Sequence, residues 1–228
     1  MPESDPPERE PSEPEPCVPR CDPAGARLLV LAAGYAARTV RAVRPEQLER
    51  PTPCAGWDVR MLLTHLEDSV AALCEGLILG RVAAGSDAHG PDGGLAACPL
   101  GREPVVPRVS DALEVLARAA GRGPGARSAV PVDGVPLRAA LLRRAGAVEL
   151  VVHGWDVAAA LDGGDRRPPP PAALAAALLP VVPLVVPPPA QRGTLFAAPL
   201  AARGDAPPGE RLLAALGRRC GPPGPPFG

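Results

Sequence analysis

Aromatic side chains are almost absent from a chain that is otherwise rich in apolar residues. Hydrophobic residues make up 46% of the 228 residues, whereas Phe, Trp and Tyr together make up only 2%. A buried core must therefore consist mainly of Ala, Leu and Val, and Ala and Leu are strong helix formers. Sheets favour β-branched and aromatic residues, so this composition predicts an all-α fold in which helices pack on helices.

The charges of the chain exclude some partners. The formal net charge is -1, and all 24 basic residues are Arg. Arg, Ala, Gly and Pro codons are rich in G and C, so the lack of Lys indicates a GC-rich bacterial source. A nucleic-acid surface needs clustered basic residues, and the overall balance of charge gives no support for one.

No apolar run reaches the roughly 18–20 residues that span a bilayer. The first 16 residues lack the apolar segment of a secretory signal, so we expect a cytoplasmic protein with no nucleic-acid or membrane partner.

Pro-rich segments divide the chain into a folded part and two tails. Residues 1–23 are rich in Pro and Glu and are predicted to be disordered. One helical domain is expected over residues 24–219, followed by a flexible tail over residues 220–228. The six Cys are expected to be reduced thiols in such a protein. Cys17 and Cys21 have no second ligand pair nearby, so they do not make a convincing zinc site.

Hydrophobic periodicity and helix-ending residues locate the helices. Asp58 and the Ser110-Asp111 pair are candidate N-caps, and Gly163-Gly164 is a stop signal. The Gly- and Pro-rich residues 81–108 are expected to form a long excursion. Helices are predicted over residues 24–43, 58–80, 110–120, 135–161, 172–179 and 207–218.

One stripe of the helix predicted over residues 135–161 carries three ionisable groups. At about 100° per residue, the side chains of Glu149, His153 and Asp156 lie within about 60° of one another. A carboxylate and an imidazole one turn apart can bind the same ion without distorting the helix. The usual alternative is an exposed ion pair. Apolar neighbours surround the stripe here, which makes a solvated face less natural.

A second candidate ligand lies on another helix. His65 occurs in the apolar run of residues 62–66. Such a His is commonly a hydrogen-bonded core residue, and the alternative is a metal ligand. Facing helices of a bundle often build metal sites from inward side chains. Two imidazole nitrogens and one carboxylate oxygen suit Zn²⁺ or a neighbouring first-row metal, and three protein ligands leave a position for water or substrate. The remaining His89 lies in a Gly-rich segment.

Three segments of the chain resemble a known family. They are residues 51–66, PTPCAGWDVRMLLTHL; residues 149–156, ELVVHGWD; and residues 210–218, ERLLAALGR. They resemble the DinB-like superfamily, and more narrowly its actinobacterial branch related to mycothiol-dependent maleylpyruvate isomerase. The resemblance implies an up-down four-helix bundle with a metal between its helices. The Pro-rich tails and the Pro-rich stretch over residues 165–190 depart from that pattern.

The resemblance also implies ligands and a cosubstrate. It places the family's metal ligands on His65, Glu149 and His153. The metal implied is a divalent ion, with Zn²⁺ first and Ni²⁺ or another first-row ion next. The thiol implied is a low-molecular-weight one, mycothiol, which would attack an electrophilic substrate in a transferase or isomerase. Asp156 is then expected to accept a hydrogen bond from a ligand His.

Two other functions compete with this hypothesis. The first is a metal-binding or stress-response protein without catalysis, and the sequence does not separate it from the enzyme. The second is a degenerate bundle that acts as an interaction module, and the intact set of ligands argues against it.

Several other residues have both a functional and a structural interpretation. Arg143 or Arg144 is a candidate for holding a substrate carboxylate, although a solvated face is the simpler interpretation. Cys54 precedes the second predicted helix, but a catalytic thiol needs a neighbouring base and the sequence shows none. Trp57 and Trp155 are expected to be core anchors rather than substrate platforms.

Overall fold

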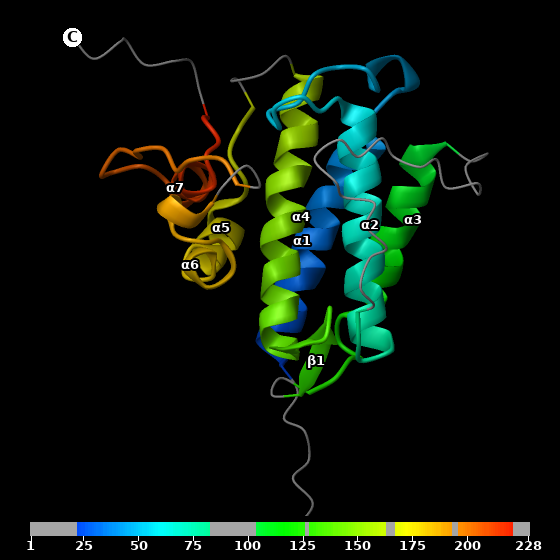
Figure 1. Ribbon diagram of the computed structural model, residues 1–228. Coiled ribbons are helices and arrows are strands. Elements are labelled where there is room, and N and C mark those ends of the chain that lie inside the picture. The colour runs from blue at the N-terminus through cyan, green and yellow to red at the C-terminus, as the bar shows by residue number, and fades with distance from the viewer. Residues whose placement is uncertain (1–21, 83–103, 126–127, 163–166, 193–195, 221–228) are drawn as a thin grey trace, which may run out of the picture.

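The computed structural model describes residues 22–82, 104–125, 128–162, 167–192 and 196–220. The expectations for residues 1–21 and 221–228, and for His89, lie outside these described residues. Four long helices form a bundle, as the composition predicts (Figure 1). These helices are α1 (Pro23–Arg41), α2 (Val59–Ile78), α3 (Val105–Ala119) and α4 (Ala139–Leu161).

Within the bundle, α1 and α2 each pack against both α3 and α4. Helices α1 and α4 run in one direction, and α2 and α3 run in the other (Figure 1). The contact between α2 and α4 is therefore antiparallel, and it is the contact that positions the candidate site.

Local signals set the starts of two of these helices. Asp22 caps α1 by accepting a hydrogen bond from Gly25 N at 3.0 Å, and Pro23 occupies the first turn, where its missing N–H costs nothing. Asp58 caps α2 by accepting from Met61 N at 2.8 Å, as the sequence predicts. Helix α4 is buried over most of its circumference, because the other elements of the fold surround it.

The start of α4 differs from the prediction of a helix over residues 135–161. Residues Val135–Arg138 form strand β2, which pairs in antiparallel register with β1 (Ala129–Val132). Asp133 and Gly134 link the strands with positive φ values of 50° and 77°. This is the backbone that a two-residue type I′ hairpin requires, and Asp-Gly is a typical sequence for it. The local turn signal therefore takes precedence over the helical pattern here.

The start of α3 also differs from the prediction. The helix begins at Val105, so the N-cap expected at Ser110 and Asp111 is wrong. Ser110 is buried inside the helix, in register with the buried Val109 and Leu113. The helical repeat of apolar residues begins about one and a half turns before the residues that were expected to cap the helix.

The C-terminal residues form a smaller helical segment against one side of the bundle (Figure 1). Helix α5 (Ala172–Leu178) packs against α7 (Pro208–Ala215) and also touches α1 and α4, while α6 (Val182–Val185) touches α4. Pro180 follows the end of α5 and Pro187 follows the end of α6, and Pro cannot continue a helix. Pro183 lies in the first turn of α6, where its missing N–H costs nothing. In the described part of the chain, the short 3-10 helices are η1 (Pro45–Gln47) and η2 (Pro189–Gln191).

Helix α7 ends in a turn that directs the chain back toward α4. Gly217 has a φ of 74°, and its N–H donates to Ala214 O at 3.0 Å. Arg218 N donates to Leu213 O at 2.8 Å. This pair of bonds is the Schellman motif, in which Gly supplies the left-handed residue. The turn places the Arg218 side chain beside α4.

Among the described residues, no single helix is both long and apolar enough to cross a membrane. One bent pair, Ala172–Leu178 with Val182–Gln191, meets that test by length and composition alone.

Candidate metal centre

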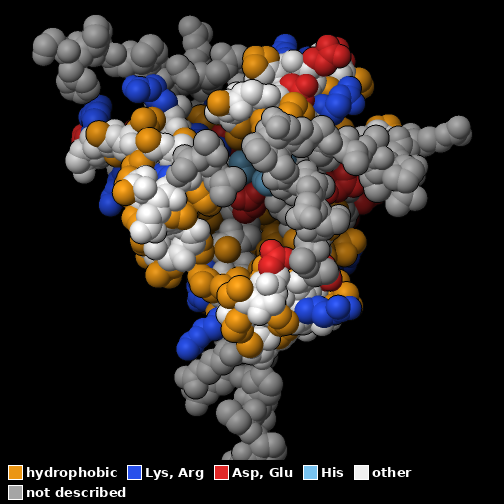
Figure 2. All heavy atoms as spheres, in the orientation of Figure 1, with side chains coloured by type: hydrophobic (Ala, Val, Ile, Leu, Met, Phe, Trp, Pro, Cys, Tyr) orange, Lys and Arg blue, Asp and Glu red, His pale blue; other side chains and the backbone are white. Residues whose placement is uncertain are grey.

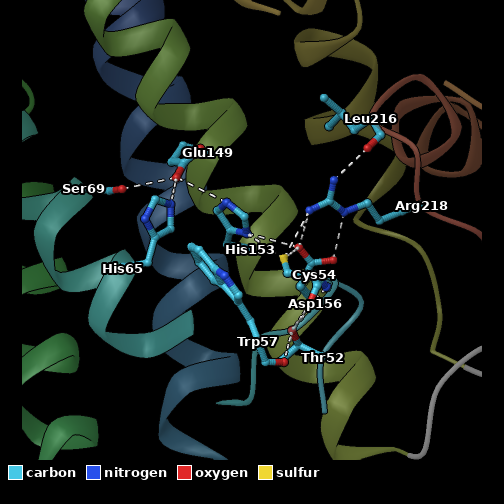
Figure 3. Close-up of polar contacts among 10 residues, drawn as sticks. All are labelled: Thr52, Cys54, Trp57, His65, Ser69, Glu149, His153, Asp156, Leu216 and Arg218. Atoms are coloured by element: carbon cyan, nitrogen blue, oxygen red, sulfur yellow. Dashed lines mark hydrogen bonds and ion pairs between the residues drawn. The ribbon is translucent and has the colours of Figure 1, made fainter. Parts of the chain in front are cut away.

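Three side chains from two helices converge on one point (Figure 3). His65 comes from α2, and Glu149 and His153 come from α4. The His65 Nε2 lies 2.8 Å from the Glu149 Oε1, and the His153 Nε2 lies 3.3 Å from the same oxygen. One ligand atom from each residue lies within 4.8 Å of the other two. The structure thus brings together the three residues singled out in the sequence.

The donor atoms suit a divalent first-row metal. Two tetrahedral ligands at about 2.0–2.1 Å from an ion lie about 3.3–3.4 Å apart. The separation of Glu149 from His153 already has this value, and that of Glu149 from His65 needs to open by about 0.5 Å, a small rotamer adjustment. Two imidazoles and a carboxylate with a side open to solvent are typical of zinc sites that keep an exchangeable position.

The cluster lies at the boundary between core and solvent. The side chains of His65 and Glu149 are 26% and 32% exposed, and that of His153 is 12% exposed. Imidazole and carboxylate surface is visible in a hollow between the bundle and the C-terminal helices (Figure 2). The site is therefore accessible to small molecules from one side, while its other side belongs to the core.

A buried carboxylate supports His153 from behind. Asp156 is completely buried, and its Oδ2 lies 3.1 Å from His153 Nδ1. Arg218 donates to the same carboxylate twice, from Nη2 to Oδ2 at 2.9 Å and from Nε to Oδ1 at 3.2 Å. The two-bonded guanidinium fixes the plane of the carboxylate. In turn, Asp156 holds the ring of His153 with Nε2 facing Glu149 and His65.

The charges of the cluster favour an ionised Glu149. Burial acts to raise the pKa of Glu149, but His153 and His65 outweigh it and hold that pKa well below its ordinary value. Burial acts to lower the pKa of His153, but Glu149, Asp156 and Cys54 outweigh it and raise that pKa above its ordinary value. The metal-free site is therefore an ion pair in which a proton on imidazole balances the carboxylate. A cation bound there would take over that role from the proton.

Thr52 fixes the shape of the turn before α2. Its Oγ1 donates to Trp57 O at 2.9 Å and accepts from Cys54 N at 3.2 Å. Gly56 takes a positive φ of 79° between them. The turn brings Trp57 edge-on against the His65 ring, with the ring centroids 5.1 Å apart. Trp57 is thus half-buried: it packs against the core, as expected, and it also contacts the His65 ring.

The same turn gives Cys54 the neighbours that the sequence did not reveal. Its Sγ lies 3.3 Å from Asp156 Oδ2 and 3.8 Å from His153 Nδ1. The Arg218 Nη2 donates to the sulfur at 3.4 Å. These partners come from positions about 100 and 164 residues away along the chain, so no local pattern could indicate them. Cys54, His153 and Asp156 also form a second group of close metal-type ligands.

Ser69 is a further polar neighbour, and a sequence signal for it exists. Its hydroxyl donates to Glu149 Oε1 at 3.2 Å. Ser69 follows His65 by four residues, so the two share one face of α2. The same helical spacing that associates Glu149 with His153 therefore identifies this residue.

The candidates for a substrate-binding Arg lie elsewhere. Arg143 is buried, and its guanidinium donates to Ala120 O and Pro124 O, where it joins α4 to the end of α3. Arg144 donates to Asp22 Oδ2 at 3.5 Å. Neither faces the cluster, and a solvated face is the wrong interpretation for Arg143. Trp155 is buried as expected and donates from Nε1 to Pro168 O.

A cavity of about 290 Å³ adjoins the cluster, and Glu149 belongs to both. Its walls come from α2 and Val82 after it, from α4 and β1, and from the end of α6 and the residues that follow it. A separate cavity of about 350 Å³ lies beside Tyr35 and Arg38 and shares no residue with the cluster. The residues that line the first cavity are Ser69, Ala72, Leu73, Val82, Val132, Leu142, Ala145, Gly146, Val148, Glu149, Val185, Val186 and Phe196.

The fold and the cluster define a class of protein, a helical bundle with a His–Glu–His group between two antiparallel helices. Comparison with protein families then identifies the family. Residues 29–158, more than half of the chain, match the family described as mycothiol maleylpyruvate isomerase N-terminal domain. The chain belongs to this DinB-like family, as the sequence motifs predict. Membership indicates a mycothiol-related, metal-binding function. Searches of curated proteins and of solved structures found no match.

Proposed function

We propose that this protein binds a divalent first-row metal ion, Zn²⁺ most readily, through His65, Glu149 and His153. We further propose that it is a transferase or isomerase that takes mycothiol, a low-molecular-weight thiol, as its cosubstrate. One observation carries the proposal: ligand atoms of these three residues lie within 4.8 Å of one another, between two helices of a chain that belongs to a mycothiol-related family.

The metal would supply one piece of chemistry, since a thiol coordinated to zinc is held as the nucleophilic thiolate at neutral pH. Residues of the chain itself hold the proposed ligands ready to bind the metal. Glu149 is ionised, and Ser69 donates to its Oε1. Asp156 accepts from His153 Nδ1, which leaves the Nε2 lone pair available for a ligand bond. Arg218 keeps Asp156 in place.

The number of ligands favours catalysis over a purely structural metal. Structural zinc usually has four protein ligands, whereas catalytic zinc has three and an exchangeable position. The cluster offers three, and the partial exposure of His65 and Glu149 leaves a side through which a thiol can enter. The Trp57 ring lies against His65 and forms one wall of this opening.

Metal content and thiol dependence test the proposal together. We expect the purified chain, after incubation with Zn²⁺ and desalting, to hold about one ion per chain by mass spectrometry of the metal. His65→Ala and His153→Ala should hold at least about tenfold less, because two ligands bind far more weakly than three. Glu67→Gln is the matched control, since Glu67 lies on α2 beside His65 but pairs with Arg108.

The outcomes separate the candidate functions. A holo protein that consumes mycothiol with an electrophile, and loses this ability with chelator, supports the enzyme. A holo protein that binds one ion but no mycothiol would instead be a non-catalytic metal-binding or stress-response protein. Equal metal content in the wild type and in both His variants would contradict the metal site itself.

A further inference from the structure

The cavity beside Glu149 has a chemically uniform wall. All its described lining residues except Ser69 and Glu149 are apolar or Gly, and they include Leu73, Val148 and Phe196. The volume of about 290 Å³ is at the lower end of ordinary ligand pockets, which measure about 300–1,000 Å³. The cavity thus fits a small molecule that presents mainly hydrocarbon.

The described wall of the cavity offers no positively charged side chain to an anion. Glu149 is the only charged residue among the described lining residues. The two Arg residues on α4 are engaged elsewhere, Arg143 with main-chain carbonyls and Arg144 with Asp22. Arg218 binds Asp156 on the other side of His153. Beyond the Glu149 end, where the proposed metal would neutralise the carboxylate, an anion would lose its hydration and meet no cation among the described wall residues. A carboxylate is therefore disfavoured in the apolar part of the cavity.

We propose that this cavity is the acceptor subsite of the thiol reaction and that it takes a small, uncharged, apolar electrophile. The inference rests on the proposed function, because it assumes a thiol held at the cluster. Glu149 connects the two places, since its carboxylate belongs to the cluster and also lines the cavity. A carbon atom at the Glu149 end of the cavity is therefore next to the position of the thiol sulfur, which provides the proximity that a bimolecular step needs.

An α,β-unsaturated ketone or aldehyde has the required properties. The thiolate sulfur forms a C–S bond with the β-carbon, and the π electron pair of the C=C bond moves to the α-carbon. The α-carbon then takes up one proton, which balances the proton that the thiol has lost. The sum is the addition of S–H across C=C. It needs no oxidant and releases no leaving group.

Equilibrium binding tests the subsite without any turnover. The probes are cyclohexanone, an unreactive uncharged ketone, and cyclohexanecarboxylate, a ring of similar size with a negative charge. Binding to the metal-free full chain is measured by ligand-observed NMR titration, because a bound Zn²⁺ would itself coordinate the carboxylate. We expect cyclohexanone to bind at least about tenfold more tightly than the carboxylate. Tighter binding of the carboxylate would overturn the proposal.

Two variants fill the cavity from two different helices. Ala72→Phe on α2 and Ala145→Phe on α4 should each weaken cyclohexanone binding by at least about tenfold, because the new ring occupies the same space. Ala71→Phe is the matched control, since Ala71 precedes Ala72 but is exposed. Circular dichroism checks that each variant is folded. Unchanged cyclohexanone binding in a folded Ala72→Phe or Ala145→Phe protein would overturn the subsite.

Failure of the subsite and failure of the proposed function have different signatures. His153→Ala removes a proposed metal ligand but no residue of the cavity wall, so it should retain cyclohexanone binding within about threefold. If the wild type binds cyclohexanone in the cavity but adds no mycothiol to 2-cyclohexenone, the proposed function fails and the subsite stands. If the wild type adds mycothiol to 2-cyclohexenone with equal efficiency in both filled variants, the function stands and the subsite fails.

Discussion

At the scale of single residues, the position of His153 depends on a buried charge. Asp156 is completely inaccessible to solvent, yet it stays ionised. Burial raises its pKa, but His153 and Arg218 outweigh that effect and lower the pKa below its ordinary value. A buried carboxylate is stable only while its partners remain. The orientation of a proposed metal ligand thus depends on an Arg that is 65 residues further along the chain.

Arg218→Met tests this dependence. The variant leaves Asp156 with one charged partner, so the free energy of unfolding should fall by about 1–3 kcal/mol in a urea titration. Zinc affinity should also fall, because His153 loses its fixed orientation. Arg219→Met is the control, since Arg219 is exposed. Equal effects of the two variants would contradict a positioning role for Arg218.

Protons should compete with the metal. The pKa of His153 is raised in the metal-free site, mainly by Glu149 against the effect of burial, so a metal ion must displace a proton from it. Zinc affinity should therefore increase with pH, because a larger fraction of the metal-free protein then has a deprotonated His153. The increase should level off once His153 is largely deprotonated in the metal-free protein. Zinc titrations between about pH 5.5 and 8 measure this directly. An affinity that is flat over that range would contradict direct coordination by imidazole.

At the scale of elements, the Schellman turn after α7 connects the C-terminal helices to the site. Gly217 lies at a positive φ, and a Cβ there would approach Ala197 Cβ at 2.6 Å and Ala198 O at 2.7 Å. Only Gly fits both conditions. The turn therefore transmits the packing of α7 to the position of Arg218, which follows directly.

Gly217→Ala should act at two places. Backbone strain and crowding should lower the free energy of unfolding by about 1–3 kcal/mol. Zinc affinity should fall as well, because displaced Arg218 no longer fixes Asp156. Gly204→Ala is the matched control, since a Cβ at Gly204 meets nothing within 4 Å and its φ is not positive. Loss of stability with unchanged zinc affinity would show that the turn does not act on the site.

At the scale of the whole molecule, the bundle has a core that does not depend on the site. The largest fully buried side chains include Leu62, Leu113 and Leu150, which come from three different helices. Leu, Val and Ala residues fill most of the remaining interior. Burial of this much apolar surface stabilises a domain without help from an ion.

Removal of the metal should therefore leave the fold intact. With excess chelator at room temperature, the far-ultraviolet circular dichroism spectrum should keep its helical form. The midpoint of thermal unfolding should fall, because a ligand that binds only the folded state stabilises it by mass action. Unfolding by chelator at room temperature would show that the metal is structural, and this result would remove the main support for catalysis.

Much of this protein could be predicted from relations that are local in the sequence. The composition predicts a helical bundle because Ala and Leu have high intrinsic helix propensity. The pairing of Glu149 with His153 follows from their spacing on one helix, which does not depend on neighbouring elements. Ser69 could have been identified beside His65 in the same way. The hairpin turn at Asp133 and Gly134 is also a local signal, but the helical pattern of the following residues obscured it.

The rest depends on how distant helices pack. His65 is 84 residues from Glu149, and whether it faces that residue depends on the rotation of α2 against α4. The turn before α2 brings Cys54 to Asp156, and the turn after α7 brings Arg218 there from the opposite end of the chain. The apolar cavity requires walls from several elements at once. Periodicity in a sequence specifies which face of a helix is buried, but it does not specify which other helix covers that face, so only the tertiary structure decides these contacts.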